Sequence, residues 1–136
     1  MALRAFLVVA SSELSGAEIR RRISIQPTYV KSIGDLAVSG RPRSESVWVF
    51  QLRACLDEHF GTSCLSHRIE ALPVSLANEF RALSNEGAGC ILDLVQEVGG
   101  ENDYSSIGLH VSADAVGWLA RAGVQISIDQ YFYADA

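Results

Sequence analysis

The sequence lacks the signatures that would place it at once in a functional class. No apolar run approaches the roughly 20 residues that a membrane-spanning helix needs. No glycine-rich phosphate loop follows a strand, and no serine lies in a nucleophile-elbow pattern. Linkers, low-complexity tracts and internal repeats are also missing. The sequence therefore predicts one globular domain over residues 1–136, with no membrane span and no recognised catalytic motif.

Cysteine is scarce as well. The chain holds three cysteines, an odd number, so at least one of them has no partner within the chain. A disulfide scaffold is not expected, and a cytoplasmic location in a reducing compartment is the simpler interpretation. Residues 1–10 are apolar like a signal peptide, but the stretch is short and a polar, helix-initiating segment follows it. We therefore interpret residues 2–11 as a first strand.

What the chain does contain is a core-forming composition and an uneven distribution of charge. Hydrophobic residues make up 49% and charged residues 20%, which is typical of a globular domain. Residues 1–68 hold nine Lys or Arg and six Asp or Glu, a balance of +3, whereas residues 69–136 hold two and ten, a balance of −8. The acidic half disfavours nucleic acid, because phosphates require positive side chains, and it is compatible with a basic protein partner.

Strand-like alternation marks several segments, most clearly residues 124–133. There the even positions, such as Ile126 and Ile128, are apolar and are expected to be buried, whereas the odd positions are polar or aromatic. Residues 47–53 and 90–98 also read as strands, and a short strand is expected at 109–111. Residues 28–45 carry two glycines and a proline, which indicates a loop or weak edge structure.

Helical signals separate these strands. Ser15 and Glu18 match a capping box, and apolar residues recur every three or four positions from 62 to 83, with Pro73 predicting a kink or a junction of two helices. Ser112 can cap a further helix that ends at Gly123. The predicted fold is α+β, with one mainly antiparallel or mixed sheet of four to five strands and helices packed on one face.

Short motifs spread over residues 3–133 give the chain a family resemblance. They include the segment 25–28 (Ile-Gln-Pro-Thr), Trp48, the segment 108–112 (Gly-Leu-His-Val-Ser) and the segment 126–129 (Ile-Ser-Ile-Asp). In these the chain resembles a bacterial family called domain of unknown function 4279. The resemblance implies a small bacterial cytosolic domain. It carries no activity and no catalytic residue with it, and the link after Trp48 departs from the short polar link expected there.

The polar face of the sheet is the best candidate site, provided that the strands are in a register that brings these residues together. Clustered carboxylates could raise one another's pKa and do acid–base chemistry, and Tyr and Arg are favoured in protein interfaces. An ordinary solvated face with weak ion pairs is the competing interpretation. The residues that would share this face are Arg4, Gln51, Arg53, Asp93, Glu97, Gln125, Asp129, Tyr131 and Tyr133.

Cysteine and histidine form no recognisable site. Cys64 and His67 lie three apart, but their spacing from Cys55 and His59 matches no zinc module. The sequence does not place His110 near Cys90 or Cys55, so no catalytic cysteine is predicted, and no metal or cofactor is expected. The basic residues 20–22, Lys31, Arg41 and Arg43 have no interleaved aromatics, so we interpret them as a charged surface rather than an RNA or phosphate site.

The sequence thus leaves three functional hypotheses. The first is a non-enzymatic protein-binding module, immunity- or antitoxin-like, that binds a basic partner with its acidic sheet face. The second is a small-ligand-binding or hydrolytic domain that uses Asp93, Glu97 or Asp129 on the open sheet face. The third is a homodimer formed through the same face or through an edge strand. An enzyme is the less favoured class because no catalytic motif is present.

Overall fold

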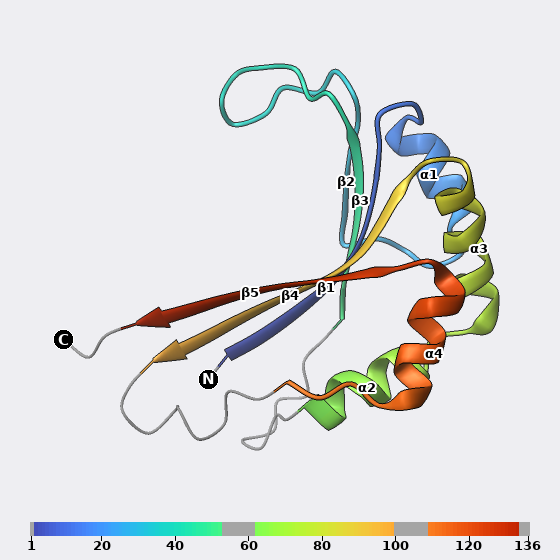
Figure 1. The fold of residues 1–136 in the computed structure, drawn as a ribbon. Coiled ribbons are helices and arrows are strands. Elements are labelled where there is room, and N and C mark those ends of the chain that lie inside the picture. The colour runs from blue at the N-terminus through green and yellow to red at the C-terminus, as the bar shows by residue number, and fades with distance from the viewer. Residues whose placement is uncertain (1, 53–61, 100–108, 134–136) are drawn as a thin grey trace.

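The computed structural model describes residues 2–52, 62–99 and 109–133. Within these ranges the chain forms five strands and four helices (Figure 1). Their order is β1 (Ala2–Ser11), α1 (Gly16–Arg22), β2 (Tyr29–Lys31), β3 (Ser46–Leu52), α2 (Thr62–Glu70), α3 (Val74–Asn85), β4 (Gly89–Gly99), α4 (Ala113–Ala122) and β5 (Gln125–Tyr133).

The strands form one mixed sheet in the order β2-β3-β1-β4-β5. Neighbours pair antiparallel except β4 and β5, which run parallel. The parallel pair is explained by the connection, because the chain leaves β4 and returns through α4 before it enters β5. The predicted α+β class, with a mostly antiparallel sheet, is confirmed.

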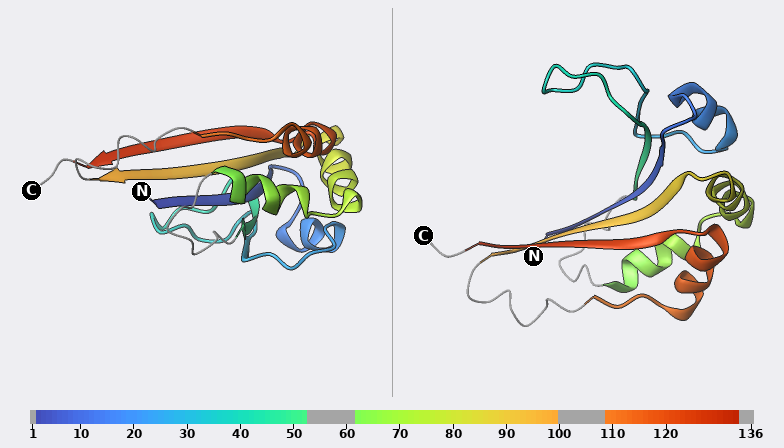
Figure 2. Two further views of the ribbon diagram at one scale, coloured as in Figure 1. Left: turned by 90° about the horizontal axis from the view of Figure 1, so that it is seen from below. Right: turned by 45° about the horizontal axis from the view of Figure 1, so that its top comes forward.

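All four helices lie on one side of this sheet (Figures 1 and 2). Alternate residues of β1, among them Leu7 and Val9, point to that side and are almost completely buried. The centre of the core is aromatic: the Phe80 ring of α3 packs edge-to-face against Trp48 of β3 and Trp118 of α4, at centroid distances of 5.7 and 6.1 Å. These three rings join the sheet to the helix layer.

Helix ends follow the predicted signals. Both hydrogen bonds of the capping box between Ser15 and Glu18 are present at the start of α1. Pro73 precedes α3, so the long helical segment is two helices rather than one kinked helix. The Ser112 side chain caps α4, and Gly123 ends it with a left-handed φ of 71°, a conformation that glycine adopts without strain.

Two local predictions are wrong. Residues 109–111 form no strand, because they lead directly into α4 and pair with no neighbouring strand. The apolar side of β5 is not buried either: Ile126 and Ile128 are 44% and 49% exposed. The alternation is present, but β5 lies at the sheet edge and its C-terminal half extends beyond the helices (Figure 1).

The predicted weak edge structure in residues 28–45 contains the three-residue strand β2. In the described parts of the chain, no helix has the length and apolar composition to cross a membrane.

Candidate functional site

The side of the sheet opposite the helices, called here the open face, carries the predicted site residues. Strand register decides this, because residues directly opposite one another point to the same side. Arg4 pairs with Val95 and Val95 with Asp129, which forms one row across β1, β4 and β5. The row on one side of it contains Gln51, Phe6, Asp93 and Ser127. The row on its other side contains Glu97 and Tyr131. The register therefore places the described members of the predicted set on one side of the sheet, and their role in binding stays a prediction. Arg53 lies outside the described residues.

Asp93 and Asp129 form a carboxylate pair on neighbouring strands of this face. Asp93 lies opposite Ser127, two residues from Asp129 on β5. Burial raises the pKa of the partly buried Asp93; the negative charge of Asp129 and a hydrogen bond between the carboxyl groups raise it further. The Oδ1 atom of Asp93 is shielded from solvent and has no hydrogen-bond partner among the residues that the structure describes. This oxygen of Asp93 therefore has no donor within the described part of the chain to offset its burial.

Glu97 is in a different electrostatic situation. Its Oε1 atom accepts a hydrogen bond from Nη2 of Arg4 at 3.0 Å, across β4 and β1. Both side chains are well exposed, so this ion pair adds little to stability. It does neutralise Glu97, which leaves the negative charge of this region on Asp93 and Asp129.

The centre of the open face is apolar, which the sequence interpretation missed. Phe6 and Val8 of β1 and Ile91 and Val95 of β4 point to this side and are partly buried, although the four described helices all lie on the other side of the sheet. Val49 of β3 points to the same side but is only 3% exposed, so the accessible part of the patch lies on β1 and β4. The available signal was the apolar run that follows Arg4 in β1 and the apolar residues on either side of Asp93 in β4. A strand segment that is apolar on both sides needs cover on both.

Aromatic side chains stand at the rim of this patch. Tyr131 and Tyr133 are 51% and 54% exposed on β5, and Tyr29 is 49% exposed on β2 at the other edge. Lys31, also on β2, adds a positive charge there. An apolar centre with tyrosines and charges around it is the composition of a protein interface.

The cysteine and histidine candidates within the described residues do not converge on one site. Cys64 is disulfide-bonded, so its thiolate is not available to a metal or a substrate, and His67 and His110 are exposed. Cys90 is buried, and burial raises the pKa of its thiol to about 11, which makes it a poor nucleophile. No group of three or more His, Cys, Asp or Glu in the described ranges could hold a metal. Cys55 and His59 lie outside those ranges.

The triple arginine of α1 is largely engaged with neighbours. Arg20 donates to the Gln26 side chain at 3.1 Å, and Arg22 forms an ion pair with Glu86 of the α3 C-terminus. These contacts fit the interpretation of a charged helix surface.

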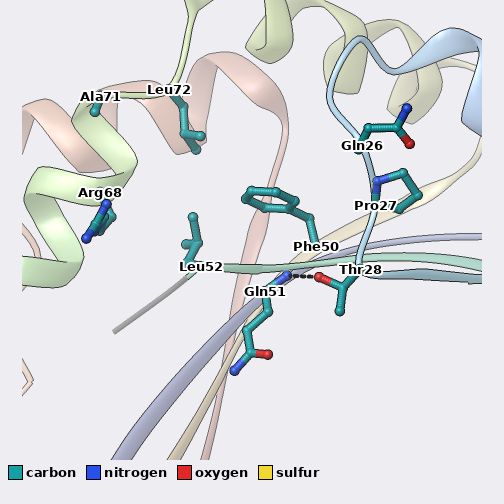
Figure 3. Close-up of a pocket in the computed structure, with 9 residues that line it drawn as sticks. All are labelled: Gln26, Pro27, Thr28, Phe50, Gln51, Leu52, Arg68, Ala71 and Leu72. Atoms are coloured by element: carbon teal, nitrogen blue, oxygen red, sulfur yellow. Dashed lines mark hydrogen bonds between the residues drawn. The ribbon is translucent and has the colours of Figure 1, made fainter. Parts of the chain in front are cut away.

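A cavity of about 520 Å³ opens between α2, β3 and the segment before β2 (Figure 3). The hydroxyl of Thr28 closes one side by accepting a hydrogen bond from the Gln51 backbone N–H at 2.9 Å. None of the predicted carboxylates lines it. Its lining comes from three separate segments, which is why no sequence motif predicted it. The lining residues are Gln26, Pro27, Thr28, Phe50, Gln51, Leu52, Arg68, Ala71 and Leu72.

Comparison with known proteins gives a family and no activity. Residues 1–133 match the family described as "Domain of unknown function (DUF4279)". No curated protein and no solved structure matches the chain.

Proposed function

We propose that this chain, which belongs to the DUF4279 family of domains of unknown function, is a protein-binding module whose open face takes a basic partner. The observation that carries the proposal is the apolar patch around Phe6 and Val95, on the side of the sheet away from the four described helices. Beside it lie the carboxylates Asp93 and Asp129, which form no ion pair with any described residue. An apolar patch on the surface of a small domain is a typical binding surface.

The chemistry of the carboxylate pair defines the partner more closely. Asp93 is partly desolvated, one of its oxygens accepts no hydrogen bond from any described residue, and a second negative charge lies beside it. A guanidinium or ammonium group placed over the pair would supply donors to both carboxylates and remove their repulsion. We therefore expect the partner to present an arginine or lysine next to an apolar side chain that packs on the Val95 patch.

An inhibitor of the immunity or antitoxin kind is our more specific proposal. An inhibitor of this kind needs no catalytic group of its own, only a rigid surface complementary to a basic partner. The −8 balance of residues 69–136, which include β4 and β5, supports this complementarity, because opposite fields accelerate association. We also propose a cytoplasmic location, although the disulfide at Cys64 weighs against a reducing compartment.

The test compares binding by charge-matched variants. A partner captured by the wild-type chain from the source organism is purified, and its Kd is measured for Asp129→Lys, Val95→Asn and the control Glu13→Lys. Asp129 and Glu13 are both exposed, but only Asp129 lies on the open face. We expect both open-face variants to weaken binding about tenfold or more and the control to bind normally.

Salt dependence provides a second readout. Binding by the wild type should weaken as ionic strength rises, and the Asp129→Lys complex should lose much of this dependence. A partner that binds the wild type and both open-face variants with equal affinity would refute the proposal. So would an equal loss of binding in Glu13→Lys, because the interaction would then depend on net charge and not on the open face.

A small-ligand-binding function is a second candidate, favoured by the cavity of Figure 3. Its walls are apolar at Phe50, Leu52 and Leu72, and Arg68 has no carboxylate partner among the described residues. This combination suits an apolar molecule with one carboxylate group. Thermal shift with a set of aliphatic and aromatic carboxylic acids tests it, and stabilisation that persists unchanged in Arg68→Gln would count against this site.

A further inference from the structure

Strand β5 has no strand paired to its outer edge among the described residues 2–52, 62–99 and 109–133. It is the last strand in the order, and all nine of its residues are exposed. The opposite edge is different, because β2 has only three residues and includes Lys31. Short edge strands and charged side chains are the usual means by which proteins prevent edge-to-edge association. By this criterion the β2 edge is protected and the β5 edge is open.

The side chains of β5 reinforce this contrast. Ile126, Ile128 and Phe132 form an apolar stripe on the helix side of the strand and are 44%, 49% and 53% exposed. The strand contains no proline, no lysine and no arginine, and Asp129 is its single charged residue. A long, apolar, unprotected edge strand is a template for pairing with another strand.

We propose that β5 pairs antiparallel with β5 of a second copy of this chain, around a twofold axis at Gln130. A partner strand must offer an apolar stripe on one side and polar or aromatic residues on the other. The β5 strand itself has this alternation. A twofold axis perpendicular to the sheet keeps the helix-side residues of both copies on one side of the joined sheet and the open-face residues of both on the other. The inference does not depend on the partner proposed for the open face.

The charge and shape of β5 select the register. With the axis at Asp129, the two aspartates would face each other, which is unfavourable. With the axis at Gln130, Asp129 lies opposite Tyr131 of the second copy, and Ile128 lies opposite Phe132. This register keeps the like charges apart and brings the apolar stripes of both copies together on the helix side.

The position of the helices also favours an axis in the C-terminal half of β5. The strand follows α4 after a single connecting turn, so its first residues lie beside the helix layer. Its last residues project beyond the helices, together with the end of β4 (Figures 1 and 2). A second copy can therefore approach residues 127–133 without meeting α4.

The resulting assembly is one continuous sheet. Two sheets of five strands would join into ten, with the seven residues 127–133 of each copy in register. An antiparallel overlap of this length makes about six to eight backbone hydrogen bonds. The two open faces would lie side by side on the same surface.

Mass measurement tests the dimer first. Light scattering after size exclusion should give twice 14.7 kDa for the wild type at micromolar concentration. Ile128→Lys places a charge in the stripe and should weaken the dimer about tenfold or more. Val116→Lys is the matched control, because Val116 is equally exposed at 48% but lies on α4. A monomeric wild type, or a dimer that Ile128→Lys leaves intact, would overturn the inference.

Cysteine cross-linking tests the register. In the proposed dimer the two Gln130 positions are directly opposite, about 5 Å apart between Cα atoms, so Gln130→Cys should form an intermolecular disulfide under mild oxidation. Gln125→Cys, five residues from the axis, would lie about 34 Å from its copy and should not cross-link. Cross-linking at position 125 but not at 130 would overturn the arrangement.

Discussion

Replacing Asp93 with asparagine should make the protein more stable at neutral pH. The carboxylate of Asp93 is partly buried, its Oδ1 has no hydrogen-bond partner in the described ranges, and Asp129 places a second negative charge beside it. All these features disfavour the ionised form in the folded state. In the unfolded chain the same carboxyl group is solvated and far from Asp129, so its pKa returns to the ordinary range.

The sign of the effect follows from linkage. Because the folded-state pKa of Asp93 is raised above its unfolded value, the folded protein binds this proton more tightly. The stability that this provides is fully present below the unfolded pKa and is lost as pH rises through the folded pKa. Asp93→Asn removes this titrating group. Its gain in free energy of unfolding over the wild type should therefore grow as pH rises from the unfolded-state pKa through the folded-state pKa of Asp93, and remain constant at higher pH.

The expected size is modest because solvent screens a partly exposed carboxylate. A like-charged pair across two strands costs about 0.5–1 kcal/mol. For a domain of this length that corresponds to about 2–4 °C in Tm. Asp129→Asn should give a smaller gain than Asp93→Asn, because burial, the largest cause of the raised Asp93 pKa, would remain.

Urea denaturation at several pH values measures this directly. The free energies of unfolding of the wild type and Asp93→Asn should differ at neutral pH and converge at about pH 3, below the ordinary aspartate pKa. Glu13→Gln is the control, since it makes the same change at an exposed position away from the pair. A variant that is less stable than the wild type at neutral pH, or a difference that does not change with pH, would refute the reasoning.

Other predictions concern the core, a helix end, an ion pair and a thiol. Phe80→Ala should lower the free energy of unfolding by about 3–5 kcal/mol in denaturant titration, because the ring is 1% exposed and joins two tryptophans. Gly123→Ala should lower Tm by several degrees in calorimetry, since its φ is 71° and a Cβ would lie 3.0 Å from Nη1 of Arg81. Arg4→Ala should change stability by less than about 0.5 kcal/mol, because its ion pair is exposed. Cys90, whose pKa is raised to about 11, should resist alkylation at neutral pH in the native protein and react after unfolding, as peptide mass spectrometry would show.

Local sequence signals predicted the elements well where the signal and its effect lie within a few residues. The capping box at Ser15, the proline between α2 and α3 and the glycine after α4 each act on the backbone groups next to them. The strand at 109–111 failed for the opposite reason. A strand requires a neighbour to pair with, and the segment before Ser112 has none.

The candidate site was predictable in part. Alternation along β4 and β5 assigned Asp93, Glu97 and Asp129 to the polar side, and the register places them on one face. The sequence did not reveal that Glu97 pairs with Arg4, because that contact depends on which strand lies beside β4. The sequence could not predict the cavity beside Arg68 either, because its walls come together only when α2 packs next to β3.

The sequence by itself therefore determined the fold class, the helix boundaries and the side of each strand on which a residue lies. These depend on local hydrogen bonding and on the fixed period of strand and helix. The tertiary structure alone decided that β5 lies at an edge, so that its apolar stripe is exposed, and that Asp129 lies beside Asp93. Strand order and register are set by packing between segments far apart in the chain, and the alternation within one strand is the same whether it lies at the centre of a sheet or at its edge.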